Sequence, residues 1–201
     1  HEDGYLIVRD LLPREALQPF IDELEQKVDE SINEAVRRGL LDAADMYSDA
    51  PFTTRLALVS DACSDVEWVW QRVHGKQHKT AGMFTLRTWP TLLDAAESLI
   101  GPEILGHPQT VTRVKLPDQE KTVVPWHQDL AYLNPEDAGE TLIVNFWIPL
   151  VNATAENGCM QVIRGSHRAG LLSHDYRVSI YKGVAEADLP DGEIVTCEVD
   201  V

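Results

Sequence analysis

The sequence predicts a helix-rich N-terminal part, about residues 1–103, followed by a β-rich part, about residues 104–201, that forms a sandwich or a barrel. In the first part, apolar residues repeat at helical spacing. In the second part, short β-rich runs alternate with turn residues. The 201 residues, 44% hydrophobic and 25% charged, are typical of one soluble globular domain, so we treat 1–201 as a single domain.

The N-terminal part begins with a short strand at residues 4–8. A helix is predicted over residues 14–38, because apolar side chains recur there at spacings of three and four, and Gly39 is a plausible stop: the stripe is Leu17, Ile21, Leu24, Val28, Ile32 and Ala35. Residues 65–73 and 90–100 also read as helices, the second closed by Gly101-Pro102. Residues 52–59 fit a strand or a helix, and residues 74–82 are polar and read as a loop.

The C-terminal part contains four predicted strands besides the segment that carries the candidate site. They are separated by turn pairs such as Asn157-Gly158, and they cover residues 110–116, 142–150, 159–163 and 194–201. This regular alternation of strand and turn is the pattern that favours a sandwich or barrel.

Composition excludes several classes of function. Asp and Glu number 33 against 17 Lys and Arg, so the net charge of −16 disfavours general nucleic-acid binding. No apolar run reaches the roughly 18 residues of a membrane span, and no signal peptide is visible. The three cysteines are far apart and form no CxxC pair, so we expect reduced thiols and a cytoplasmic protein.

The chemistry is carried by Pro125-Trp126-His127-Gln128-Asp129. In a strand, His127 and Asp129 would point to the same side. An imidazole and a carboxylate that converge in this way, joined by a second His from a distant strand, make the facial triad of non-haem Fe(II) enzymes, which leaves coordination positions open. His-x-Asp alone is a weak signal, and its alternative is a surface His beside a turn Asp.

The surrounding motifs resemble the phytanoyl-CoA dioxygenase family of Fe(II)/2-oxoglutarate-dependent oxygenases. The resemblance is densest between residues 123 and 176, and it rests on His127-Gln128-Asp129-Leu130, Trp147-Ile148-Pro149-Leu150, Glu156-Asn157-Gly158-Cys159-Met160, Gly165-Ser166-His167-Arg168 and Ser173-His174-Asp175-Tyr176, with Asp3-Gly4-Tyr5 as the usual opening. It implies a mainly β fold with flanking helices, the double-stranded β-helix or jelly-roll barrel of cupin-like proteins. It also implies a hydroxylase that consumes O2 and 2-oxoglutarate and releases succinate and CO2, with ascorbate as a reductant in vitro.

By this resemblance, His127 and Asp129 are iron ligands and Trp147 lines the 2-oxoglutarate pocket. Gln128 either touches the co-substrate or faces away. Halogenating relatives carry a small residue at the position of Asp129, so the carboxylate indicates hydroxylation.

Four further residues are candidates from their positions alone. Arg113 and Lys115 share one face of a predicted strand and either hold an anion, with Arg113 assigned to the co-substrate and Lys115 to the substrate, or are simply exposed. Tyr132 and Asn134 either line the substrate entrance or have no functional role.

One departure from the family pattern concerns the distal His and the Arg that pairs with 2-oxoglutarate. Neither is visible, and we expect both, with the last barrel strands, beyond Val201. His74, His78, His107, His167 and His174 are not assigned to the metal. Two alternatives therefore stay open: a non-catalytic cupin-like binding protein and a metal-dependent isomerase on the same barrel. A small-molecule substrate is expected. The sequence does not indicate which substrate it is or what the oligomeric state is.

Overall fold

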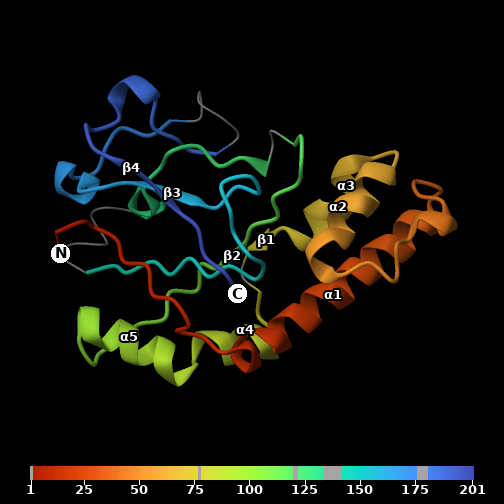
Figure 1. Ribbon diagram of the computed structural model, residues 1–201, viewed down its shortest axis with the longest axis horizontal. Coiled ribbons are helices and arrows are strands. Elements are labelled where there is room, and N and C mark those ends of the chain that lie inside the picture. Colours follow the sequence, from red (N-terminus) through yellow and green to blue (C-terminus); the bar gives the residue numbers. More distant parts are fainter. Residues whose placement is uncertain (1, 77, 120–121, 134–141, 176–180) are drawn as a thin grey trace. The chain divides into compact units, whose positions relative to one another are not determined.

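The computed structural model describes residues 2–76, 78–119, 122–133, 142–175 and 181–201, and its elements are labelled in Figure 1. The chain divides into two compact units. We call Asp10–Pro117 the helical unit, and we call His1–Arg9 together with Asp118–Val201 the β unit. The single-domain assignment, with a change of structure near residue 103, stays a prediction.

The helical unit is built around its longest helix. Within the described residues it contains α1 (Arg14–Arg37), α2 (Phe52–Ala62), α3 (Val66–Val73), α4 (Ala81–Arg87) and α5 (Pro90–Ile100), together with a 3-10 turn at Ala43–Asp45. A short antiparallel pair, β1 (Gly75–Lys76) and β2 (Val111–Thr112), joins two of its loops. Helices α3 and α4 pack on α1, and α2 packs on α3 (Figure 1).

Helix α1 confirms the predicted apolar stripe. Leu17, Leu24, Val28 and Ile32 are at most 4% exposed and form the centre of the core. The helix ends where Gly39 adopts φ +70°, a left-handed conformation that glycine accepts without strain. Helix α5 also matches its prediction, since Pro90 occupies the first turn and Gly101 closes the helix.

Helix α4 was not predicted. The sequence suggested a polar loop up to residue 82, but α4 begins at Ala81 and is held by Glu23 of α1. The Glu23 carboxylate accepts hydrogen bonds from the Thr80 hydroxyl and, at 2.7 Å, from the Gly82 backbone N–H. The carboxylate therefore satisfies donors at the start of α4, where helix backbone N–H groups lack partners within the helix.

The β unit contains the antiparallel pair β3 (Met160–Ile163) and β4 (Ile194–Cys197), with Met160 opposite Cys197 and Ile163 opposite Ile194. A bridge between Ala153 and Val199 prolongs the pairing. Short 3-10 helices lie at Asp129–Tyr132, Ser166–Ala169 and Glu186–Asp188. These elements confirm, over shorter lengths, the strands predicted at residues 159–163 and 194–201.

Several predicted strands differ from the structure. The described residues contain no strand at 4–8 or 142–150, and only Val111–Thr112 of residues 110–116 are paired. An apolar run becomes a strand only where a neighbouring segment takes up its backbone hydrogen bonds. Helices flanking small sheets agree with the predicted architecture, although helix exceeds strand in the described part. The strands described there do not close a barrel, and the jelly-roll barrel stays a prediction.

The N-terminal residues attach to the β unit. Asp3 accepts a hydrogen bond from the Gly165 N–H at 2.8 Å through its carbonyl oxygen and forms an ion pair with Arg164 at 2.7 Å. Gly4, at φ +83°, lies directly against the His167 ring, where a Cβ atom would collide. The Asp3-Gly4 opening motif therefore serves close packing against the turn at residues 164–167.

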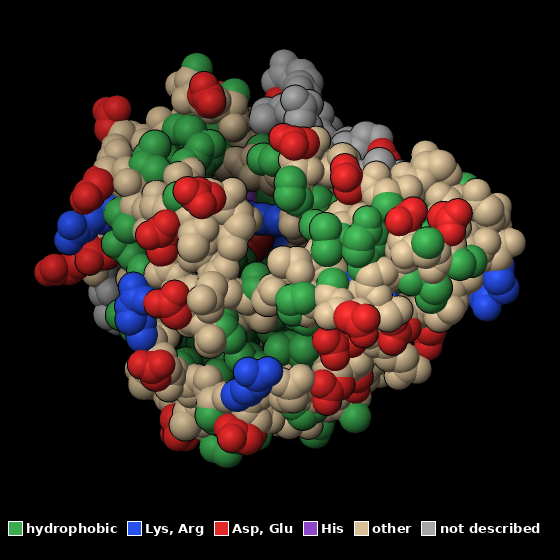
Figure 2. Space-filling model, turned by 45° about the vertical axis from the view of Figure 1, so that its right-hand side comes forward, with side chains coloured by type: hydrophobic (Ala, Val, Ile, Leu, Met, Phe, Trp, Pro, Cys, Tyr) green, Lys and Arg blue, Asp and Glu red, His purple; other side chains and the backbone are tan. Residues whose placement is uncertain are grey.

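The surface is acidic, as the net charge requires. Figure 2 shows Asp and Glu side chains spread over the visible face, with fewer Lys and Arg among them. Among the described helices, none combines the length and the hydropathy that crossing a membrane demands. All three cysteines, Cys63, Cys159 and Cys197, are buried free thiols, as predicted. Burial, reinforced by the neighbouring Cys159, raises the pKa of the Cys197 thiol.

Candidate metal centre

His127 and Asp129 lie together in the β unit. The Nε2 atom of His127 is 3.3 Å from Oδ1 of Asp129, and the two side chains are 26% and 54% exposed. Nδ1 of His127 is 2.8 Å from the Pro125 carbonyl oxygen. Because a carbonyl oxygen only accepts, Nδ1 carries the proton, and in the neutral ring Nε2 presents its lone pair on the side of Asp129.

The local backbone differs from the predicted strand. Gln128 is extended (φ −119°, ψ 130°), but the chain then turns into the 3-10 helix Asp129–Tyr132. The prediction of a ligand strand was therefore wrong. The predicted convergence of the two side chains holds nevertheless, because the single extended residue between them leaves both on one side.

The donor set of this pair suits a first-row metal ion. In zinc sites, an imidazole nitrogen and a carboxylate oxygen each lie about 2.0–2.2 Å from the metal, so two such atoms 3.3 Å apart are within reach of one ion. Metal-binding imidazoles commonly donate their other N–H to a backbone carbonyl, as His127 does to Pro125. Among the described residues, no cluster of three His, Cys, Asp or Glu side chains is formed, so the pair offers two protein ligands.

The residue between the two candidate ligands is fixed to a distant loop. The Gln128 side-chain amide donates to the Gly170 carbonyl and accepts from the Leu172 N–H, both at 2.8 Å. Its backbone N–H donates to Nε2 of His174, also at 2.8 Å. These contacts favour the alternative in which Gln128 faces away from the co-substrate.

A second contact segment is held by the 3-10 helix that begins at Asp129. The Tyr132 hydroxyl donates to the Lys182 carbonyl at 3.2 Å, and the Lys182 ammonium donates to the Ala131 carbonyl at 3.2 Å. The rings of Tyr132 and His127 meet edge to face, with centroids 6.2 Å apart. Tyr132, predicted at the substrate entrance, is thus placed beside the candidate ligand His127.

Four predicted site residues remain: Trp147, Arg113, Lys115 and Asn134. Trp147 belongs to the β unit and is 36% exposed. Arg113 and Lys115 belong to the helical unit. Asn134 lies outside the described residues. Their assignments to the co-substrate or substrate stay predictions.

Sequence reasoning did not assign His174, Leu172 or Lys182 to the site. For His174 a signal existed, since Ser173-His174-Asp175-Tyr176 was among the motifs that carried the resemblance. For Leu172 and Lys182 there was none, because backbone groups make most of their contacts.

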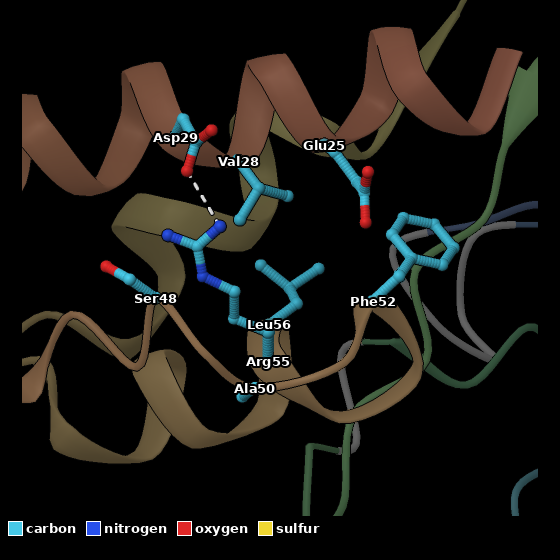
Figure 3. Close-up of a pocket in the computed structure, with 8 residues that line it drawn as sticks. All are labelled: Glu25, Val28, Asp29, Ser48, Ala50, Phe52, Arg55 and Leu56. Carbon is cyan, nitrogen blue, oxygen red and sulfur yellow. Dashed lines mark ion pairs between the residues drawn. The ribbon is translucent and has the colours of Figure 1, made fainter. Parts of the chain in front are cut away.

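A pocket of about 200 Å³ lies within the helical unit between α1 and α2 (Figure 3). Its charged wall is an ion pair between Arg55 and Asp29 at 2.7 Å, in which the Arg55 side chain is only 13% exposed. The residues that line it include neither His nor Cys. The Arg55–Asp29 pair joins α1 to α2 across this pocket.

Comparison with known proteins gives one family. The sequence model of the family described as phytanoyl-CoA dioxygenase (PhyH) matches residues 1–200. The human protein "Phytanoyl-CoA dioxygenase, peroxisomal" is 30% identical over 182 residues, covering 87% of this chain and 47% of that protein. "Probable phytanoyl-CoA dioxygenase" of Caenorhabditis elegans is 28% identical over 185 residues, covering 87% of this chain and 53% of that protein.

A relative with another printed name also matches. "L-proline trans-4-hydroxylase" of Streptomyces griseoviridis is 35% identical over 99 residues, covering 44% of this chain and 36% of that protein. The chain spans about half the length of the phytanoyl-CoA dioxygenases that it matches. No solved structure matched it.

Proposed function

Because the chain belongs to the phytanoyl-CoA dioxygenase (PhyH) family, we propose that it is an Fe(II)- and 2-oxoglutarate-dependent oxygenase that hydroxylates a small molecule. The observation that carries the proposal is the convergence of His127 Nε2 and Asp129 Oδ1 at 3.3 Å. The names of the relatives support a dioxygenase or hydroxylase reaction.

In this proposal, His127 and Asp129 hold the metal. When bound, Fe(II) with 2-oxoglutarate supplies the chemistry that inserts one oxygen atom of O2 into a substrate C–H bond and the other into succinate, with loss of CO2. The hydrogen bond from His127 to Pro125 keeps the imidazole in one tautomer and orientation. Asp129 would hold the metal at a position that another anion could otherwise take, which favours hydroxylation over halogenation.

The other site residues complete the proposal. We assign Trp147 and Arg113 to the surroundings of 2-oxoglutarate, and Tyr132, Lys115 and Asn134 to those of the substrate. The position of Tyr132 beside His127 supports its assignment. For Gln128, a positioning role replaces direct contact with the co-substrate, because its amide is engaged with Gly170 and Leu172. The proposed substrate class is small organic molecules. We also propose a cytoplasmic location, because the three free thiols fit a reducing compartment.

The test is a substrate screen on the full-length protein, scored by succinate formation with Fe(II), ascorbate and 2-oxoglutarate. We expect substrate-dependent succinate from the wild-type protein. In Asp129→Ala we expect a loss exceeding about 100-fold, the upper end of what removal of an outer-shell partner costs. Asp191→Ala is the matched control, since it removes an exposed carboxylate from a turn of the same unit.

Each contrary outcome identifies its own alternative. Unchanged succinate formation by Asp129→Ala would refute the metal assignment. Substrate binding without succinate formation would favour a cupin-like binding protein. Conversion of a substrate without consumption of 2-oxoglutarate would favour an isomerase.

A further inference from the structure

His174, Leu172 and Gln128 form a closed ring of hydrogen bonds, and Gln128 is the residue between the two candidate ligands. The Gln128 N–H donates to His174 Nε2, His174 Nδ1 bonds to the Leu172 carbonyl, and the Leu172 N–H donates to Gln128 Oε1. Each of the three distances is 2.8 Å. The ring links positions 46 residues apart in the sequence.

The direction of each bond in the ring is determined by its partners. The Leu172 carbonyl can only accept, so Nδ1 of His174 carries the proton. Nε2 is then the lone-pair atom that receives the Gln128 N–H. The His174 ring therefore accepts a hydrogen bond at Nε2 and donates one at Nδ1. No aliphatic side chain can do either.

The hydrogen bond to His174 is made by the backbone N–H of Gln128, which lies between the two candidate ligands. The Gln128 N–H belongs to the peptide between His127 and Gln128, and the extended backbone of Gln128 sets the direction of Asp129 relative to His127. A partly buried N–H without an acceptor is unfavourable, so loss of His174 would release this peptide to seek another partner. The 3.3 Å separation of the candidate ligand atoms depends on that peptide remaining in place.

We propose that His174 is a positioning residue of the metal centre, which holds the His127–Asp129 pair in its metal-binding arrangement through the backbone N–H of Gln128. This inference rests on the proposed function. It assigns a role to a histidine outside the ligand set. It also means that the loop at residues 170–174 helps to position the metal ligands. Outer-shell partners of metal ligands typically contribute about 10- to 100-fold in metal affinity.

Two substitutions separate this role from simple packing. His174→Gln places an amide oxygen near the position of Nε2 and retains an acceptor for Gln128. His174→Asn places its amide near the position of Nδ1, where it faces Leu172 but does not reach Gln128. His107→Asn is the control, because His107 also accepts a backbone N–H, from Gln109 at 3.2 Å, but lies in the helical unit.

The measurement is the affinity of the full-length protein for Co(II), a redox-stable probe, followed by its visible absorption spectrum. We expect His174→Asn to bind Co(II) about 10- to 100-fold more weakly than the wild type. His174→Gln and His107→Asn should stay within about threefold of it. Thermal unfolding of the metal-free variants shows whether each one is folded.

The outcomes are distinct. Wild-type affinity in folded His174→Asn, or equal weakening in His174→Asn and His174→Gln, overturns the assignment and leaves the proposed function standing. A wild-type protein that binds no Co(II) overturns the proposed function and the inference with it. If His174→Asn does not fold, His174→Leu, which also lacks an acceptor for the Gln128 N–H, replaces it, and wild-type affinity in folded His174→Leu overturns the inference.

Discussion

The imidazole of His78 is enclosed in the helical unit beside a lysine. His78 is 8% exposed, and its Nδ1 lies 3.0 Å from the Lys27 ammonium. Its Nε2 is buried without a hydrogen-bond partner in the described structure and faces Gly75. Burial, with the positive charge of Lys27 as the second cause, lowers the pKa of His78, and Glu23 only partly opposes the shift. The neutral ring is therefore the form that the fold accommodates.

We predict that His78 makes the free energy of unfolding fall as the pH falls. The unfolded chain binds a proton at His78 near the ordinary pKa of about 6.5, and the folded chain binds it only at lower pH. Stability from this group is thus fully present above about pH 6.5 and is lost below it. In His78→Gln, urea unfolding between about pH 7.5 and about pH 5.5 should show a smaller loss of stability than in the wild type. The exposed His107→Gln is the control, and an unchanged slope in His78→Gln would contradict the prediction.

The individual residues of the candidate site were predictable from the sequence only in part. The pair His127 and Asp129 followed from one short motif and its resemblance, and the structure brings these side chains together. The tautomer of His127 and the attachment of Gln128 to His174 were not predictable. They depend on backbone carbonyls and on a loop 46 residues away, which local spacing does not describe.

Helix α4 shows how one element depends on another. It has seven residues, too few for stability in isolation, and its first turn is held by Glu23 of α1. The backbone at Gly82 also approaches α1 so closely that a Cβ atom there would collide with the backbone of Pro19. The helix is therefore a product of tertiary contact.

We predict that Glu23→Ala lowers the free energy of unfolding by about 1–3 kcal/mol, the cost of leaving part-buried donors without an acceptor. Glu23→Gln should cost less, since its amide oxygen still accepts one bond. Thermal or urea unfolding measures both variants. Glu25→Ala, a neighbouring carboxylate on α1, is the matched control, and equal losses in Glu23→Ala and Glu25→Ala would count against a specific role for Glu23.

The predicted elements that succeeded are those specified within their own sequence. Helices α1 and α5 carry apolar periodicity and glycine stops, and both were predicted within one or two residues. Those that differed need partners elsewhere: α4 needs Glu23, and residues 142–150 need a neighbouring strand. Leu142, Ile143 and Phe146 are each at least 40% exposed. Burial of these side chains therefore does not stabilise residues 142–150 as a strand.

The whole molecule carries a net charge of −16, and Figure 2 shows acidic side chains spread over the visible face. Like charges at this density repel one another in the compact state more than in the expanded chain. The same field disfavours the approach of a doubly charged anion such as 2-oxoglutarate and favours that of a divalent cation.

We predict that sodium chloride stabilises the fold. Raising its concentration from about 0.01 M to about 0.15 M shortens the screening length from about 30 Å to about 8 Å, which weakens the net repulsion. The melting temperature should rise over this range. Chloride is preferred to sulfate, because sulfate strengthens apolar burial independently of charge. A falling melting temperature would mean that attractive pairs such as Arg55–Asp29 outweigh the repulsion.

The N-terminal attachment of the β unit has a consequence for biosynthesis. Asp3 and Gly4 are synthesised some 160 residues before their partners Arg164, Gly165 and His167. At about 5–20 residues per second, the opening segment waits roughly ten seconds or more before it can dock. The helical unit, Asp10–Pro117, is made entirely within that interval. Asp3 and Gly4 thus reach their native contacts only after the helical unit has been made, and a nascent-chain chaperone would meet them while they are still exposed.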